Sequence, residues 1–317
     1  MNLVRFAGIW LLFGLLVPAL FAQKPAVIYA DGNAIVFLAA DGKVVQRIAT
    51  NAEAESIAFS PVSGRLVIQT KGEWGGGLFL VDRATGKLQK LLTRPLYFKP
   101  LPKKERDPEN EKENEVYADP EFDRSGNLLV FAVHDSGPGA WDAVLASGPL
   151  AVLDLRTLKA HILESTLLKD QEGPAYSNDP HWSPDQSHIL WDHEAGSELA
   201  DAEGKASKDI SNWFDLKESE QGYAECWLDD HSILYAVYPG SALPVRFSVL
   251  DLATRKSRSA AEVLGLGPEN LDGAREVNVT DSMILVRKDV ALFFDRKTRR
   301  PLFTLPDRKQ PIELLRP

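Results

Sequence analysis

Residues 179–191, Asp179-Pro-His-Trp182-Ser-Pro-Asp185-Gln-Ser-His-Ile189-Leu-Trp191, join an aromatic residue, a Ser-Pro-Asp turn and an apolar strand. Related stretches start at Ala58-Phe59-Ser-Pro61, Asp119-Pro-Glu-Phe122 and Ala224-Glu-Cys-Trp227, and a weaker version spans Val277 to Val286. The anchors Phe59, Phe122, Trp182 and Trp227 lie 63, 60 and 45 residues apart. Recurrence at this spacing is typical of repeat architectures, in which each repeat is one supersecondary unit.

A second motif accompanies the first and consists of apolar residues followed by Asp-x-x-Thr-x-Lys/Arg. Four full copies begin at Asp82, Asp154, Asp251 and Asp295, and shorter relatives begin at Asp41 and Asp201. An Asp carboxylate accepts backbone N–H bonds two residues further on, and Thr does the same more weakly. The motif therefore predicts a tight hairpin, with the Lys or Arg starting the return strand on the solvent side.

The two motifs together predict four antiparallel strands per repeat, which is one blade of a β-propeller. We expect an all-β, six-bladed propeller as a single domain over residues 23–317. The first blade has sequence for only three strands, so we expect the segment near Ile312–Leu315 to return and complete it. Closure hides sheet edges that otherwise template aggregation. The predicted blades are 26–50, 54–92, 117–163, 177–210, 223–260 and 275–305.

Asp179-Pro-His-Trp-Ser-Pro-Asp185 with Ile189-Leu-Trp, and Phe59-Ser-Pro61 with Leu66-Val-Ile, resemble the repeat core of the TolB-like, or WD40-like (PD40), β-propellers. The resemblance covers nearly all of the chain after residue 22 and implies the propeller fold. It also implies that the motif residues build strand-to-strand turns rather than a site. The sequence departs from the family pattern at Gln186, where the family has Gly, and at Leu228-Asp-Asp, and no TolB-like α/β domain precedes the repeats.

Residues 1–22 have the layout of a secretory signal: Arg5, an apolar run from Phe6 to Val17, and Pro18-Ala-Leu-Phe-Ala22. We expect cleavage after Ala22 and a periplasmic or extracellular location. The alternative is an uncleaved anchor, but the apolar run is shorter than the roughly 20 residues that span a bilayer. No other segment is apolar enough for an integral membrane span. The single cysteine, Cys226, is expected to be a small buried hydrophobe.

The chain has 317 residues and a net charge of −9, from 36 basic and 45 acidic residues. An acidic chain with no basic stripe argues against nucleic-acid binding, which depends on neutralising phosphates. A Ser-His-Asp hydrolase is also disfavoured, since neither a Gly-x-Ser-x-Gly elbow nor a following α/β domain is present.

Two classes of function remain. The favoured one is a non-enzymatic binding or scaffold module that holds a protein or glycan at the loop-bearing face of the propeller, with no cofactor. Its predicted contacts are Trp74, Tyr97, His134, Trp141 and Asp142, because aromatic and polar residues in loops line ligand sites. The alternative is a propeller enzyme, of polysaccharide lyase or lactonase type, with a divalent metal in the axial channel. Its candidate ligands are Asp192, His193 and Glu194.

Overall fold

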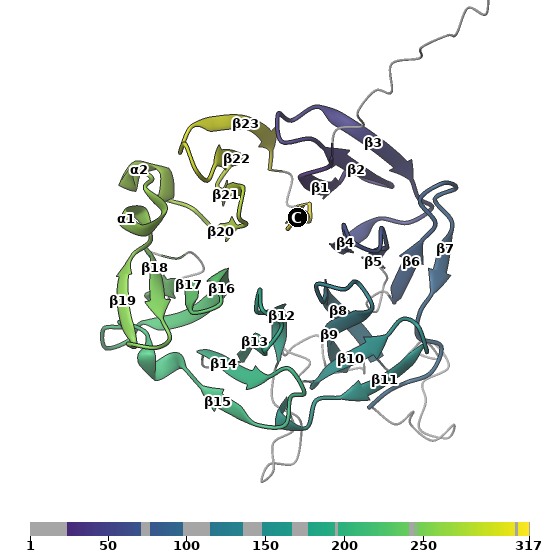
Figure 1. Cartoon of the computed structure of the whole chain (residues 1–317), viewed down its shortest axis with the longest axis horizontal. Coiled ribbons are helices and arrows are strands. Elements are labelled where there is room, and N and C mark those ends of the chain that lie inside the picture. The colour runs from purple at the N-terminus through teal and green to yellow at the C-terminus, as the bar shows by residue number, and fades with distance from the viewer. Residues whose placement is uncertain are drawn as a thin grey trace, which may run out of the picture.

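The computed structural model describes residues 24–70, 77–97, 115–135, 148–166, 177–193, 196–240, 244, 246–307 and 310–316. These residues form six four-stranded antiparallel sheets around a common axis (Figure 1). The predicted all-β, six-bladed propeller is confirmed. The proposed signal peptide, residues 1–22, lies outside the described residues.

Each blade has one strand at the axis and three more strands that follow outwards in chain order, except in the first. The strands of blades one to three are: β24 (Ile312–Leu314), β1 (Val27–Ala30), β2 (Ala34–Leu38) and β3 (Val44–Ala49); β4 (Ala54–Phe59), β5 (Leu66–Thr70), β6 (Leu78–Val81) and β7 (Leu88–Lys90); β8 (Glu115–Phe122), β9 (Leu128–Asp135), β10 (Leu150–Asp154) and β11 (Lys159–Ile162).

Blades four to six repeat the same plan, and short helices connect some of their ends. Their strands are: β12 (Asn178–Trp182), β13 (His188–His193), β14 (Gly196–Asp201) and β15 (Ser207–Asp209); β16 (Gln221–Asp229), β17 (Ser232–Tyr238), β18 (Arg246–Asp251) and β19 (Lys256–Ser259); β20 (Glu276–Val279), β21 (Met283–Arg287), β22 (Val290–Asp295) and β23 (Pro301–Pro306). The helices α1 (Ala260–Leu264) and α2 (Pro268–Leu271) lie between blades five and six, while the 3-10 turns η2 (Glu164–Thr166) and η3 (Ser211–Trp213) follow β11 and β15. No helix in the described part of the chain has the length and apolarity that crossing a membrane requires.

The ring closes through β24, which pairs antiparallel with β1 in the register Val27 to Leu314. The expected return of the C-terminal segment to the first blade is therefore confirmed. Its apolar residues Ile312 and Leu314 are 8% and 5% exposed and pack between blades six and one. Closure thus joins blade six to blade one, because β24 pairs with the backbone of blade one and makes apolar contacts with both blades.

The predicted Asp hairpins connect the third and fourth strands of each blade. In one of them the Asp82 Oδ1 accepts hydrogen bonds from the N–H groups of Ala84 and Thr85, at 2.9 and 3.0 Å. Asp251 and Asp295 each accept from both the N–H and the hydroxyl of the Thr three residues on. Because strands alternate in direction, these hairpins and the first-to-second-strand turns share one end of the propeller, the turn face. The second-to-third-strand connections and the blade-to-blade crossovers share the opposite end, the loop face.

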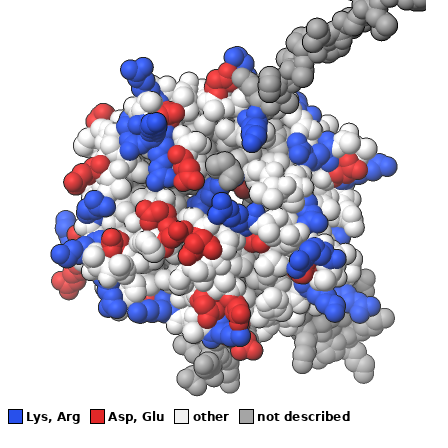
Figure 2. All heavy atoms as spheres, in the orientation of Figure 1, with Lys and Arg blue, Asp and Glu red and all other residues white. Residues whose placement is uncertain are grey.

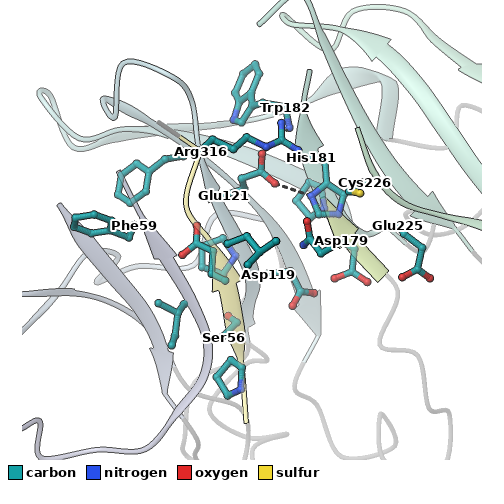
Figure 3. A pocket seen from close by; sticks show the side chains of 18 of the residues that line it. Ser56, Phe59, Asp119, Glu121, Asp179, His181, Trp182, Glu225, Cys226 and Arg316 are labelled. Atoms are coloured by element: carbon teal, nitrogen blue, oxygen red, sulfur yellow. Dashed lines mark hydrogen bonds and ion pairs between the residues drawn. The ribbon is translucent and has the colours of Figure 1, made fainter. Parts of the chain in front are cut away.

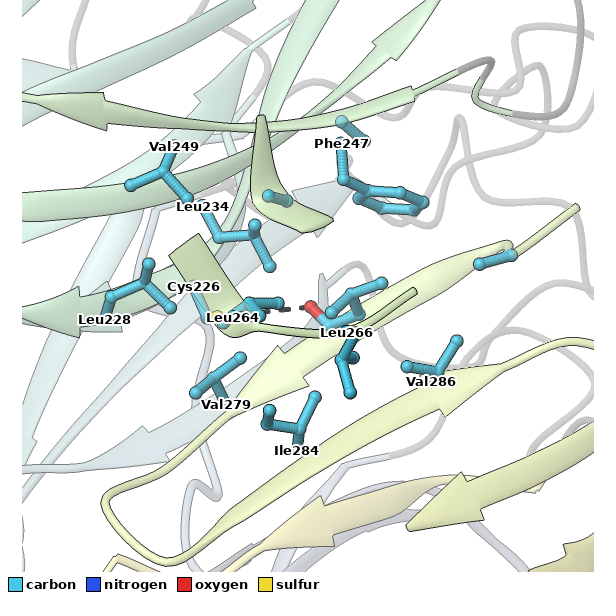
Figure 4. Close-up of a cluster of buried hydrophobic side chains, with 14 of the residues drawn as sticks. Cys226, Leu228, Leu234, Phe247, Val249, Leu264, Leu266, Val279, Ile284 and Val286 are labelled. Atoms are coloured by element: carbon cyan, nitrogen blue, oxygen red, sulfur yellow. Dashed lines mark hydrogen bonds between the residues drawn. The ribbon is translucent and has the colours of Figure 1, made fainter. Parts of the chain in front are cut away.

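The apolar core is a ring of six clusters, each lying between two neighbouring blades. Between blades five and six, Cys226, Leu234 and Val249 pack against Val279 and Ile284, with Leu264 of α1 alongside (Figure 4). Cys226 is 1% exposed, so its predicted role as a small core hydrophobe is confirmed. A core of this shape leaves the axis itself free for polar side chains.

Candidate functional site

An axial channel of about 680 Å³ runs through the centre of the ring. Figure 3 shows Asp119, Glu121, Asp179 and Glu225 beside this space. Every innermost strand contributes at least one carboxylate to the channel lining: Glu55 from β4, Asp119 and Glu121 from β8, Asp179 from β12, Glu225 from β16, Glu276 from β20 and Glu313 from β24. Asp192 of β13 adds a further carboxylate.

β-bulges place acidic residues at the axis in four blades. The strand register shifts between Ala54 and Ser56, Ala118 and Glu121, Asn178 and His181, and Ala224 and Cys226. The skipped residues include Glu55, Asp119, Asp179 and Glu225. A bulge bends its strand and redirects the extra side chain. The carboxylates therefore reach the channel because the regular strand alternation is interrupted beside them.

Two of the bulges hold their acid in a left-handed backbone conformation. Asp119 and Asp179 have φ angles of 50° and 43°, and a Pro follows each of them. Asp tolerates this region better than most residues other than glycine. The interpretation that the repeat motif only builds turns is wrong for its Asp-Pro pair. Ser183-Pro-Asp185 forms the turn, whereas Asp179 precedes it and lines the channel.

The inner edge of each blade explains why carboxylates are favoured there. An edge strand presents N–H groups that lack a partner strand, and buried N–H groups need acceptors. The Glu121 Oε1 accepts the Trp182 N–H at 3.1 Å, and the Asp192 Oδ1 accepts the Ala224 N–H at 3.2 Å. The Glu225 Oε2 accepts the Val277 N–H at 3.4 Å. Each bond joins one blade to the next, so these acids also hold the ring together.

Asp119 and Asp179 lie close enough to repel one another. Burial raises the pKa of Asp119, and the charge of His181 and a backbone hydrogen bond from Asp179 oppose the shift. The charge of Asp119 is the main cause that raises the pKa of Asp179 to about 6, and burial adds to it. Asp179 is nevertheless exposed to the channel space. This pair would therefore gain from a positive charge placed in the channel.

For Asp192 and Glu225, burial is the main cause of the raised pKa. It raises the pKa of Asp192 to about 8, although the Ser197 hydroxyl donates to the Asp192 Oδ1 at 2.6 Å. Burial also raises the pKa of Glu225 well above its usual range, and nearby Glu276 and Asp192 add to the effect. Among the described residues, none of Asp119, Asp179, Asp192 and Glu225 forms a salt bridge with Lys or Arg.

The turn-face end of the channel contains cationic groups. His181 Nδ1 lies 2.6 Å from Glu121 Oε2. Burial disfavours the charged imidazole, but the charge and hydrogen bond of Glu121 outweigh it and raise the pKa of His181. Arg316 follows β24 in blade one, and its Nη2 donates to the Trp227 carbonyl of blade five at 3.3 Å. Arg316 thus reaches over this end of the channel (Figure 3).

In blade six, arginine side chains pair with the acidic side chains at the loop-face end of the channel. Arg287 contacts both Glu276 and Asp307 at 2.9 Å, and Arg275 contacts Asp307 at 3.1 Å. On the face shown in Figure 2, acidic and basic side chains lie next to one another around the central opening. Among the described channel acids, those without a Lys or Arg salt bridge therefore include acids of blades three, four and five and Glu313 of blade one.

The predicted binding residues are placed as follows. Tyr97 is 36% exposed and follows blade two. His134 lies near the end of β9, its Nε2 is 3.4 Å from the Ser177 carbonyl, and burial lowers its pKa. Neither of these two lines the channel. Trp74, Trp141 and Asp142 lie outside the described residues, so the predicted contact set stays a prediction.

The three candidate metal ligands do not form a group among the residues described. Asp192 faces the channel, whereas His193 Nε2 lies 3.9 Å from Asp209 Oδ1 on the outer strand β15. Successive residues of a strand point to opposite faces, which accounts for this separation. Glu194 lies outside the described residues. Over the described part of the chain, no three His, Cys, Asp or Glu side chains are arranged to hold a metal ion.

Sequence reasoning missed the ring of acids. The signal is visible in retrospect: Glu55, Asp119, Asp179 and Glu225 each lie two to four residues before the aromatic anchor of their blade. The spacing varies because the bulges differ. Periodicity alone does not show on which side of an irregular strand such a residue lies.

The fold and site define a six-bladed β-propeller with an acidic axial channel, and solved structures share the fold. TolB from Acinetobacter baumannii is 12% identical, with a TM-score of 0.56 over 92% of this chain and 67% of that one. An oligogalacturonate lyase in complex with manganese is 15% identical, with a TM-score of 0.54 over 84% and 69%. A chain of a nidogen/laminin complex is 11% identical, with a TM-score of 0.56 over 92% and 99%.

The sequence comparisons give no further assignment. No family model matches this chain, and no curated protein matches it. At these levels of identity the structural neighbours show a shared fold, and TolB proteins are among them. A shared fold does not determine function, which depends on the residues of the channel.

Proposed function

We propose that this chain is an exported, non-enzymatic binding module that holds a protein partner at the loop face. A cationic side chain of the partner enters the axial channel. The observation that carries this proposal is the cluster of Asp119, Asp179, Asp192 and Glu225 around one cavity, without a Lys or Arg partner among the described residues. Like charges held close together, as at Asp119 and Asp179, disfavour each other's ionised form, and a cation from a partner offsets that repulsion.

Electrostatics also favour this class of partner over an anionic one. Acids line the channel from all six blades, while the arginines lie mainly in the sector of blade six and at the turn-face end. A cleft lined by one sign of charge concentrates ligands of the opposite sign. The loop face is the end where Glu55, Asp179 and Glu276 begin their strands, so a partner would approach from there.

The test is titration of the purified protein with acetyl-arginine amide, monitored by NMR at low ionic strength. We expect saturable binding that weakens by about tenfold or more in the Asp119→Asn/Asp179→Asn variant, since coupling between close charge pairs amounts to about 1.5 kcal/mol or more and about 1.4 kcal/mol corresponds to tenfold in affinity. The matched control is Glu203→Gln/Glu262→Gln, which removes the same formal charge from exposed positions outside the channel. Absence of binding to the unmodified protein, or equal binding by both variants, would overturn the proposal.

A second candidate is a propeller enzyme of lyase or lactonase type with a divalent metal. One observation favours it: the pKa of Asp179 is raised to about 6, and a general base works best when its pKa lies near the working pH. Oligogalacturonate, named for one structural neighbour, is a polyanion that the channel acids repel. Incubation with oligogalacturonate and manganese, followed by ultraviolet detection of unsaturated products, tests this candidate. Product formation that is lost in Asp179→Asn would replace the binding-module proposal.

A further inference from the structure

Two tyrosines of blade five line the loop-face end of the axial channel. Tyr223 belongs to the innermost strand β16, and Tyr238 is the last residue of the neighbouring strand β17. Tyr238 pairs with Gln221, the first residue of β16, which places it at the loop face. The centroids of the two tyrosine rings are 5.7 Å apart, and the ring planes meet at 73°. This edge-to-face contact is a preferred arrangement of aromatic pairs, so it helps to fix the Tyr238 ring in place.

Tyr238 has an apolar environment and a polar one. Its side chain is half-buried and packs partly against the apolar cluster between blades five and six. It also lines the channel, together with the carboxylates of Asp192 and Glu225. Burial is the main cause that raises the pKa of Tyr238, and the charges of Glu225 and Asp192 add to it. The ring and the two carboxylates therefore face the same region of the channel.

Asp192 and Glu225 each use one oxygen for hydrogen bonds within the protein. The Asp192 Oδ1 accepts from the Ser197 hydroxyl and the Ala224 N–H, and the Glu225 Oε2 accepts from the Val277 N–H. Within the described part of the chain, the other oxygen of each carboxylate accepts no hydrogen bond. A ligand in the channel can therefore donate to both acids without breaking the bonds that join the blades.

An aromatic ring beside carboxylates distinguishes between kinds of cation. The face of a Tyr ring is the negative side of its quadrupole and attracts a cation placed over it. A guanidinium group is planar and weakly hydrated, so it can stack on the ring while its N–H groups donate sideways to carboxylates. An ammonium group is compact and strongly hydrated, so removing its water costs more. This combination of groups therefore favours arginine over lysine.

We propose that the channel binds the guanidinium group of an arginine side chain of the partner, and that Tyr238 is the residue that selects arginine over lysine. The guanidinium plane stacks on the Tyr238 ring, and its N–H groups donate to Asp192 and Glu225. Because β17 ends at the loop face, an arginine entering from that face meets Tyr238 at the mouth of the channel. This inference rests on the proposed function and names the cation that the channel takes.

The experiment compares acetyl-arginine amide with acetyl-lysine amide on the purified protein by NMR titration at pH 8, where Asp192, with a pKa of about 8, is partly ionised. We expect the arginine derivative to bind about tenfold more tightly. Tyr238→Leu keeps an apolar side chain but no ring, and it should reduce this preference by about five- to tenfold. Tyr238→Phe keeps the ring and should retain the preference. The δ-methylene protons of bound arginine should shift upfield in the unmodified and Phe proteins, and not in the Leu variant.

Trp213→Leu is the matched control, because it removes an aromatic side chain that contacts Lys208 and Arg255 and does not line the channel. If both probes bind the unmodified protein equally, or if Tyr238→Leu weakens both to the same extent, the selecting role of Tyr238 is wrong while the binding module stands. Loss of the preference in Tyr238→Phe would assign it to the hydroxyl and overturn the stacking. If neither probe binds, the proposed function is the part that fails.

Discussion

Asp192 illustrates how one side chain in this protein serves structure and chemistry together. Its Oδ1 accepts hydrogen bonds from the Ser197 hydroxyl and the Ala224 N–H, so it fastens blade four to blade five. Burial nevertheless raises its pKa to about 8. The folded protein therefore retains a proton on this group that the unfolded chain releases near pH 4 (about 3.9 for a free Asp).

This difference predicts how stability depends on pH. Because the folded state binds the proton more tightly, the contribution of Asp192 to the free energy of unfolding is greatest below about pH 4 and is lost as the pH rises to about 8. Asp192→Asn keeps the accepting oxygen and never ionises. We expect the free energy of unfolding of the variant to exceed that of the unmodified protein by about 1–3 kcal/mol at pH 8, and by less at pH 5.

Urea unfolding at both pH values measures the effect, with Asp272→Asn as a control at an exposed position. If Asp192→Asn raises the free energy of unfolding by the same amount at pH 5 and at pH 8, the raised pKa of Asp192 is wrong. Proton release on binding of acetyl-arginine amide, measured by calorimetry in two buffers, would give independent support.

The hairpin between the third and fourth strands is the element that the chain repeats most faithfully. Four copies place their fifth residue in the left-handed region: Gly86, Leu158, Arg255 and Arg299, with φ angles of 71°, 55°, 55° and 63°. Glycine adopts this conformation at no steric cost, whereas other residues pay about 1–2 kcal/mol. Leu158 is also 54% exposed, so its side chain gains little from packing.

The hairpins therefore predict two substitutions of opposite effect. Leu158→Asn should raise the free energy of unfolding by about 0.5–1 kcal/mol, because Asn tolerates the left-handed region. Gly86→Ala should lower it by more than about 1 kcal/mol, because its added Cβ would stand 1.8 Å from the Ala49 carbonyl oxygen as well as in a strained conformation. Chemical denaturation of both variants measures the changes. Destabilisation by Leu158→Asn would contradict the backbone conformation described for this turn.

At the scale of the whole molecule, stability depends on closing the ring. Each apolar cluster joins two neighbouring blades, so an unclosed ring would leave apolar faces and strand edges in water. β24 completes blade one, and the adjacent Leu315 packs between blades one and two. The segment therefore links two of the six clusters as well as one sheet.

Removal of residues 311–316 should lower the melting temperature by about 10 °C or more and promote self-association, since several kcal/mol of burial are lost. Thermal unfolding and light scattering measure the two effects. A synthetic peptide of residues 310–316 should restore the melting temperature in part, because it can pair with β1. The Glu313→Gln chain is the control that keeps the strand, and a truncated protein as stable as this control would show that closure is not required.

Much of this architecture follows from local sequence. The Asp-x-x-Thr hairpins, the Ser-Pro-Asp turn after Trp182 and the apolar strands indicate blade number and strand order. Each of these depends on residues only a few positions apart. The closing strand was predictable too, since the first repeat contains three strands where the others contain four. Cys226 could be assigned to the core from its apolar neighbours.

The channel was decided by tertiary structure. A bulge shifts the register by one residue, and such a shift reverses which side of a strand a residue faces. Asp119 and Asp179 read as parts of a turn motif in the sequence, yet the packing of blade three against blade four brings them together at the axis although 60 residues separate them. Burial raises the pKa of Asp119, and the nearby charge of Asp119 together with burial raises the pKa of Asp179. Neither cause is a property of the local chain. Neighbouring residues in the sequence thus determine the blades, whereas the convergence of six separate strands determines the chemistry at their centre.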